Sequence, residues 1–285
     1  SLLFILPENF SKYSTETYLF SINKNKVTDA FSSKKIDEVN KVNIQFNENV
    51  DINDAQGLES VCFYGDTVFF SLERNNYTAF LLKGIFYPDK NLIIIDKSTL
   101  IEHPLNEKIK NSTIEAVFVF NENIYCIHEC NGIVNNYSEA VVSVYNTNLG
   151  FIKYLPVEEL EYRITDVTSV SGNCFFATNY YFAEKEYDSY NPKNDKLIKY
   201  IEKEFSHYQY IKNNDYLDEV ERIVKFDISE DSIFFKDNKP YYIEIENEGK
   251  NIEGIESLLY KNNLYFLIVT DRFPEDNLYF VKIEN

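Results

Sequence analysis

Carboxylates are the residues of this chain whose spacing could do chemistry. Seven of them occupy matching positions in four stretches of sequence: Glu59, Glu73, Glu115, Glu129, Asp166, Glu256 and Asp271. The first two pairs are 14 residues apart and the last pair is 15 apart. Two short strands joined by a turn return to their starting end over such a spacing, at ~3.3 Å per residue. We therefore expect each pair to lie side by side at one end of a hairpin.

Acids gathered in this way repel one another and raise one another's pKa values, so something must offset their charge. A hard cation such as Ca²⁺, which takes six to eight oxygen ligands, is one candidate. Nearby arginines are the other, because Arg74, Arg163 and Arg272 lie in or beside the same stretches. The spacing predicts a metal site formed by the seven acids, and a purely structural ring of acid–arginine pairs is the alternative.

A repeated sequence phrase identifies the strands that position these acids. Gly-Leu-Glu-Ser-Val at 57–61 returns as Gly-Ile-Glu-Ser-Leu at 254–258, and weaker copies start at Thr113 and Ile164. Each copy continues as an apolar run, a polar turn and a second apolar run, which is typical of a β-hairpin. Further strand-like runs follow each hairpin, and four strands in roughly 50 residues indicate a propeller blade.

The sequence thus predicts an all-β fold, with residues 1–285 forming one β-propeller domain. We expect about five four-stranded blades, with four or six as alternatives. If the first strand of each blade is innermost, the acids meet at one mouth of the channel. The final repeat is one strand short, so residues 1–6 or 17–22 are expected to complete it, because ring closure removes an exposed sheet edge.

Residues 184–218 depart from the repeat. Leu197, Ile198, Ile201 and Phe205 fit one face of a helix, so we expect an insertion carrying a short helix. Its role is either a lid or protein-binding element, or simply a loop of the kind that surface insertions form without cost.

The amino-acid composition excludes some classes of function for this protein. The formal net charge of −18 excludes a basic nucleic-acid-binding surface and fits a cation, a basic partner or plain solubility. No apolar run approaches the ~20 residues that a membrane span needs. The four cysteines Cys62, Cys126, Cys130 and Cys174 do not have zinc-site spacing, and either one disulfide or buried free thiols would account for them.

The repeated phrase and its following strand resemble those of the esterase-like phytase family and the related SdiA-regulated proteins, both β-propellers. The matching segments are 57–73, 114–129, 165–180 and 252–271. This chain departs from the family pattern at Ala116, at Asp166-Val167 and at Asn179-Tyr180. The resemblance implies an extracytoplasmic, periplasmic or secreted, bacterial protein and a Ca²⁺-assisted phosphoester hydrolase.

Three functions follow as expectations. The first is an exported or soluble binding module whose acidic channel mouth holds a cation or small ligand. The second is a phytase-like hydrolase, in which metal ions on Glu59, Glu115, Glu256 and Asp271 polarise a phosphate and activate water. The third is a protein-interaction scaffold that uses the 184–218 insertion.

Overall fold

The computed structural model describes residues 2–7, 16–74, 78–104, 112–131, 140–182, 192, 195–201, 212–213, 216–217, 219–235, 239–243, 251–271 and 277–283. The strands are β1 (Leu2–Ile5), β2 (Tyr18–Asn23), β3 (Asn40–Phe46), β4 (Ala55–Tyr64), β5 (Thr67–Arg74), β6 (Thr78–Tyr87), β7 (Leu92–Leu100), β8 (Ile114–Phe120), β9 (Asn123–His128), β10 (Val141–Asn146), β11 (Phe151–Pro156), β12 (Arg163–Val167), β13 (Cys174–Phe182), β14 (Lys212–Asn213), β15 (Tyr216–Leu217), β16 (Glu219–Ile228), β17 (Ile233–Phe234), β18 (Tyr241–Tyr242), β19 (Asn251–Tyr260), β20 (Asn263–Asp271) and β21 (Asn277–Lys282). The helical segments are α1 (Lys24–Ser33) and the short 3₁₀ turns η1 (Pro88–Lys90) and η3 (Ile198–Tyr200).

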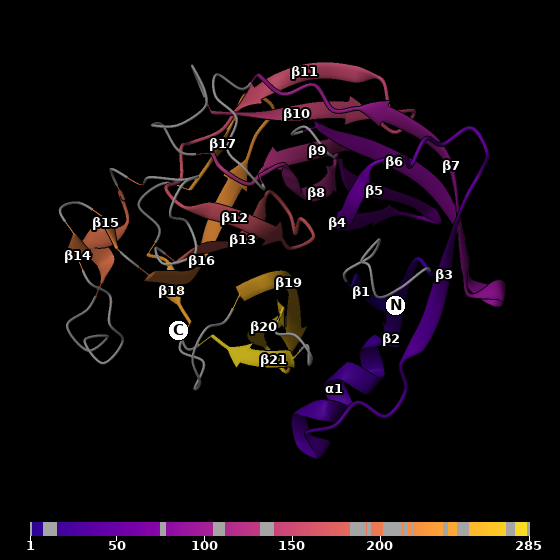
Figure 1. Cartoon of the computed structure of the whole chain (residues 1–285). Helices are drawn as coiled ribbons and strands as arrows, with labels where there is room; N and C mark the ends of the chain where they lie inside the picture. The colour runs from indigo at the N-terminus through magenta and orange to yellow at the C-terminus, as the bar shows by residue number, and fades with distance from the viewer. Residues whose placement is uncertain are drawn as a thin grey trace.

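These strands form a propeller-like arrangement of twisted sheets around a common centre (Figure 1). The sheets have the orders β1-β2-β3-β7-β6-β5-β4, β11-β10-β9-β8, β12-β13-β16-β17 and β19-β20-β21, with β18 beside β16 and β14-β15 as a separate hairpin. Strands β1, β4, β8, β12 and β19 are innermost (Figure 1). The predicted all-β class is confirmed. The blade count stays a prediction, because β3 pairs in parallel with β7 and joins β1–β3 to the first sheet.

The four predicted hairpins are present, and their turns explain their geometry. Asn121 and Glu122 join β8 to β9 with φ values of 46° and 61°, while Lys261 and Asn262 join β19 to β20 with 49° and 63°. Two successive positive φ values are those of a type I′ turn, whose twist matches that of the flanking strands. The turns therefore set the register of each hairpin from residues adjacent in sequence.

The seven-stranded sheet curls until its two edge strands approach each other. Phe4 of β1 and Phe63 of β4 stack with their ring centroids 4.1 Å apart, although these strands lie at opposite ends of the sheet. Inside the curl, an apolar core includes Leu19, Val68 and Ile93, all fully buried. Burial of this core holds the curled shape, since apolar burial stabilises by ~25 cal/mol per Å².

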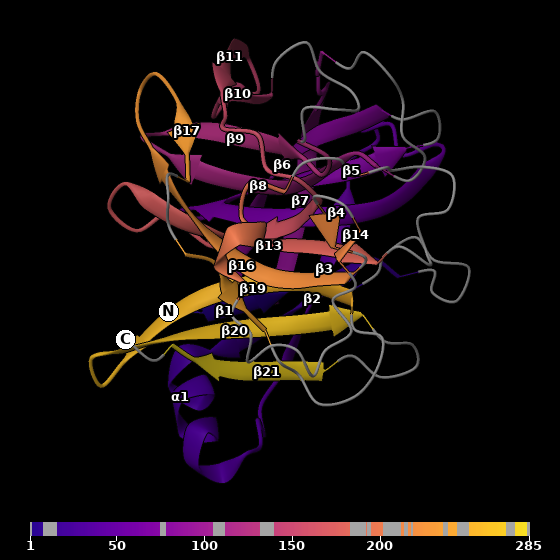
Figure 2. The ribbon, with the colours of Figure 1, turned by 90° about the vertical axis from the view of Figure 1, so that its left-hand side faces the viewer.

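Ring closure differs from the expectation that an N-terminal strand pairs with the last sheet. Among the described residues β21 pairs with β20 alone, and β1 pairs with β2. Side chains close the gap instead: Leu3 and Val27 pack against Leu267, and the Phe31 ring stacks 5.0 Å from that of Tyr260. Figure 2 shows α1 beside the β19–β21 sheet. The two ends of the chain are thus joined by apolar packing rather than by backbone hydrogen bonds.

The insertion expected at 184–218 is described only in part, and Phe205 lies outside the described residues. In the described part, the expected helix is only the 3₁₀ turn η3. The Leu197 side chain is buried in the core between the second and third sheets. The Asp195 carboxylate accepts two hydrogen bonds of 2.9 Å from Arg222 of β16, both side chains being almost fully buried. Residues 195–197 are therefore anchored in the core of the fold.

Within the described residues, no helix has the length and apolar character that crossing a membrane would require. All four cysteines are free thiols, so the disulfide alternative is not realised. Cys126 and Cys130 are buried, as expected for cysteines that pack as small apolar side chains.

Candidate ligand-binding cavity

The repeated acids are placed by β-bulges in the innermost strands. The β4–β5 register shifts between Leu58 and Ser60, leaving Glu59 as the extra residue. The β8–β9 register shifts in the same way around Glu115. A bulge bends its strand and re-aims the unpaired residue. Two carboxylates that are 56 residues apart in the sequence are thereby brought to the same level of the propeller.

The structure explains why the repeated phrase has glycine at position 57. A Cβ atom at Gly57 would lie 2.2 Å from Oε1 of Glu59, because the Glu59 side chain folds back over the glycine. The corresponding atom at Gly254 would meet Val269 at an ordinary 3.4 Å. The two copies of the phrase therefore do not have the same structure.

The register of β19 confirms this difference. Both strands have a bulge directly before the repeated glycine, at Gln56 in β4 and at Glu253 in β19, but only β4 has a second bulge at Glu59; Glu256 pairs with Leu267 in a regular stretch of the ladder. Glu253, which the spacing argument missed, is thus the counterpart of Gln56. Its sequence signal is weak: it is simply the acid that precedes the repeated glycine.

One group of acids gathers around Glu115. Burial raises the pKa of Glu115 well above its ordinary value, and the negative charges of Glu59, Glu129, Glu253 and Glu73 raise it further. All of these contributions favour the protonated form of the Glu115 side chain. Proximity of Glu59, Glu73, Glu115 and Glu129 was predicted from the sequence, and these charges agree with it.

Arg163 supplies the counter-charge to part of this group. It donates a buried hydrogen bond of 2.5 Å to Oε2 of Glu129. Burial raises the pKa of Glu73, the nearby Glu129 charge raises it again, and Arg163 lowers it. Of the three arginines considered, Arg74 pairs instead with Asp51 at 3.4 Å, and Arg272 lies outside the described residues. The acid–arginine alternative is thus realised at Glu129.

A second group contains Asp166 and Glu256. The Ser169 hydroxyl donates to Oε2 of Glu256 at 2.6 Å, and the Ile255 amide donates to Oδ2 of Asp166 at 2.9 Å. Burial raises the Asp166 pKa to about 8; the backbone amides of Ile255 and Val167 act against this, and the Glu256 charge adds to it. Six of the seven acids therefore fall into two groups. Asp271 ends β20 opposite Asn251, and its side chain lies outside the described ones.

Among the side chains that the structure describes, no three Asp, Glu, His or Cys residues are arranged to hold a metal ion. The predicted Ca²⁺ site formed by all seven acids stays a prediction. The two described histidines add no ligand set: the rings of His103 and His128 stack at 5.2 Å, and burial lowers the His103 pKa to about 3. Both rings are neutral at ordinary pH, which fits a role in packing.

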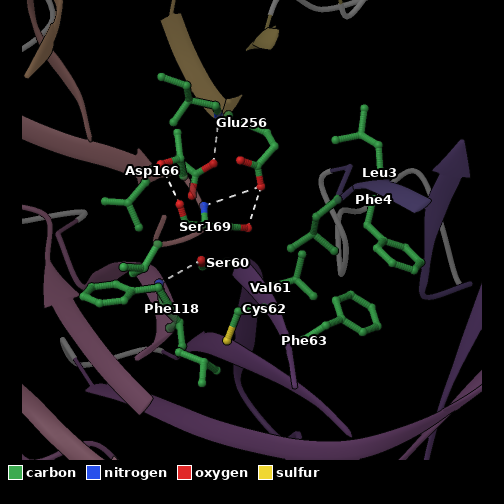
Figure 3. A pocket seen from close by; sticks show the side chains of 18 of the residues that line it. Leu3, Phe4, Ser60, Val61, Cys62, Phe63, Phe118, Asp166, Ser169 and Glu256 are labelled. Carbon is green, nitrogen blue, oxygen red and sulfur yellow. Dashed lines mark hydrogen bonds between the residues drawn. The ribbon is translucent and has the colours of Figure 1, made fainter. Parts of the chain in front are cut away.

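A cavity of about 630 Å³ occupies the centre, lined by all five innermost strands together with Leu267 of β20 and Leu278 of β21. Figure 3 shows that its two sides differ. Asp166, Ser169 and Glu256 form a polar side, and Leu3, Phe4 and Phe63 lie on the other, apolar side. Cys62 also lines the cavity, and burial followed by the Asp166 charge raises the pKa of its thiol. That thiol is therefore not an activated nucleophile.

Comparison with known proteins adds little to this description. No family model and no curated protein matches the chain. Among solved structures, Sqt1 of Saccharomyces cerevisiae aligns over 95% of this chain and 67% of its own, with 8% identity and a TM-score of 0.36. A putative 6-phosphogluconolactonase from Bacteroides uniformis aligns over 95% and 79%, with 10% identity and a TM-score of 0.32. Likeness at this level carries no argument about function. The phytase-like and SdiA-regulated resemblance has no counterpart in these two structures, and the propeller-like, β-rich fold rests on the chain's own sheets.

Proposed function

We propose that this protein is a binding module whose central cavity takes a small organic ligand. The observation that carries the proposal is the cavity itself, about 630 Å³ in volume and formed jointly by the innermost strands. Ligand sites in proteins are concave, of ~300–1,000 Å³, and largely apolar with a few converging polar groups. The polar side around Asp166 and the apolar side around Phe63 fit this description.

Binding is better supported than hydrolysis. The described cavity lining includes no histidine that could serve as a base, and its only cysteine is held protonated by burial. Ser169 is hydrogen-bonded to the Glu256 carboxylate, whereas a nucleophilic serine is activated by an adjacent general base such as histidine. A phytase-like reaction would require metal ions, and the described acids do not form a metal-holding group. Hydrolysis, the protein-scaffold role and the extracytoplasmic location stay predictions from the sequence.

Filling the cavity tests the proposal. Val61 of β4 and Val170, in the loop between β12 and β13, both line it, so Val61→Trp and Val170→Trp should each occupy part of its volume. The probe is N-phenyl-1-naphthylamine, a neutral dye that fluoresces in apolar sites. We expect saturable binding to the unaltered protein and at least a ~10-fold loss of affinity in each variant, since one well-filled subsite contributes ~1.4 kcal/mol or more.

Val39→Trp is the matched control, because Val39 is exposed and outside the cavity lining. It should leave the dye affinity unchanged. Circular dichroism and melting curves establish that each variant is folded. Absence of saturable dye binding, or binding that neither cavity tryptophan weakens, would overturn the proposal.

A further inference from the structure

The two sides of the cavity specify the chemistry of its ligand, an inference that rests on the proposed function. Phe4 and Phe63 stack on one side, with Leu3 beside them. These side chains offer a surface for an aromatic or aliphatic group and contribute no hydrogen bonds. The apolar side thus fits the body of a ligand, and the polar side must fit its head group.

The polar side offers acceptors. The carboxylates of Asp166 and Glu256 accept from Ile255, Ser169 and Ser257, which are hydrogen-bond donors of the protein. These three donors are therefore already engaged by the two acids and are not available to an anionic head group. Ionised carboxylates accept hydrogen bonds and cannot donate them. A head group that carries several N–H donors and a positive charge is the chemical complement.

The charges around the cavity also favour a positively charged head group. Its described lining contains five acids against a single basic residue, Lys24 of α1; the acids are Glu59, Glu122, Asp166, Glu253 and Glu256. Walls of one sign and low polarity concentrate the opposite charge. An anionic ligand would meet this field with repulsion.

An organic cation fits better than a metal ion. Ca²⁺ replaces its water with six to eight oxygens, and the described acids are not grouped to supply them. An ammonium group has three donors and is satisfied by two or three acceptors. It also leaves the apolar side to be covered by the rest of the same molecule.

We propose that the cavity binds a primary or secondary amine with an apolar body, its ammonium group at Asp166 and Glu256 and its body against Phe4 and Phe63. Binding next to Asp166 favours the ionised form of that side chain. Because the Asp166 pKa is about 8 without ligand, the complex forms with release of a proton near neutral pH. Affinity rises as pH rises through about 8, until the amine itself loses its proton.

The other titratable groups that line the cavity with Asp166 do not reverse this rise of the affinity with pH. They are Glu59 and Cys62 of β4, Glu122 after β8, Glu253 and Glu256 of β19, and Lys24 of α1. The acids among them attract the cation more strongly as they ionise. The Cys62 thiol has a raised pKa, so it stays neutral over this range.

The test compares three probes of the same shape by calorimetry: 2-phenylethylamine, 2-phenylethanol and phenylacetate. We expect the amine to bind at least ~10-fold more tightly than the alcohol, since hydrogen bonds to charged groups contribute ~1.5–3 kcal/mol. Phenylacetate should bind most weakly. Glu256→Gln should remove most of the preference for the amine while leaving the alcohol affinity unchanged, and Glu48→Gln, a change of an exposed acid, should alter neither.

Proton release gives a second readout. Titrations at pH 7.5 in two buffers of different ionisation enthalpy should show proton release with the amine, and Asp166→Asn should abolish it. Equal affinity for amine and alcohol, or N-phenyl-1-naphthylamine binding without any of the three probes, would overturn the ligand class and leave the proposed function standing. If no probe and no dye binds, both fail.

Discussion

Buried charge is handled in opposite ways in two regions of this molecule. In the third sheet, Arg222 and Asp195 are both almost fully buried and share two hydrogen bonds of 2.9 Å. Asn179 takes a third hydrogen bond, from Nε of Arg222 at 2.8 Å. Around Glu115, in contrast, five acids gather near one arginine. The first region pairs its charges, whereas in the second the surroundings of Glu115 raise its pKa and favour its neutral form.

Burial alone therefore does not decide whether a side chain is ionised. The pKa of Arg222 is raised by Asp195 in spite of burial, which by itself would lower it. The pKa of Glu115 is raised by burial and then by its neighbours, so all contributions favour the neutral form. The two regions should therefore respond differently to mutation and to pH.

The largest expected loss of stability comes from breaking the Arg222–Asp195 pair. Arg222→Met leaves the Asp195 carboxylate buried and unpaired, so we expect the free energy of unfolding to fall by ~3–5 kcal/mol, measured by urea denaturation. Replacing both residues, Arg222→Met with Asp195→Leu, should recover most of this loss. Lys196→Met is the control, because Lys196 lies 3.8 Å from Glu159 with both side chains partly exposed; it should cost no more than ~1 kcal/mol. An equal cost for Arg222→Met and Lys196→Met would contradict the comparison.

A smaller change is expected when Glu115 is replaced, and it is a gain in the free energy of unfolding rather than a loss. Its pKa is raised on folding, so the native state holds this proton more tightly than the unfolded state, and stability falls as pH rises above the ordinary range of the carboxyl group. Glu115→Gln should therefore raise the free energy of unfolding at pH 8 and change it little at pH 4.

Urea denaturation at a series of pH values measures this slope. Glu48→Gln, at an exposed position, should leave the slope unchanged. A Glu115→Gln variant that is destabilised more at pH 8 than at pH 4 would show that the side chain is ionised and paired.

The smallest effect distinguishes the two copies of the repeated phrase. Gly57→Ala brings a methyl group against the Glu59 carboxylate and should cost up to ~1 kcal/mol, while Gly254→Ala should stay within ~0.5 kcal/mol. In a Glu59→Ala background the cost of Gly57→Ala should disappear, as a double-mutant cycle would measure. Equal costs at both glycines would mean that the two copies have the same structure after all.

Much of the fold was predictable because its signals are local. Turns such as Asn121-Glu122 and alternating apolar runs identify the hairpins, and the 14-residue spacing predicts that Glu115 lies near Glu129, whose charge raises the Glu115 pKa. Glu253 was missed because a bulge adds a residue without leaving a mark in the sequence. The Asp195–Arg222 pair was missed because its partners lie 27 residues apart and on different elements.

The strands, their hairpin turns and the excess of acid follow from local sequence, since alternation, turn residues and composition act over a few neighbouring residues. Which acids of different sheets gather around Glu115, which forms of them are favoured and what space they enclose depend on the folded structure. A pKa depends on burial and on charges brought in by other strands, and the central cavity exists only where five innermost strands from distant parts of the chain come together.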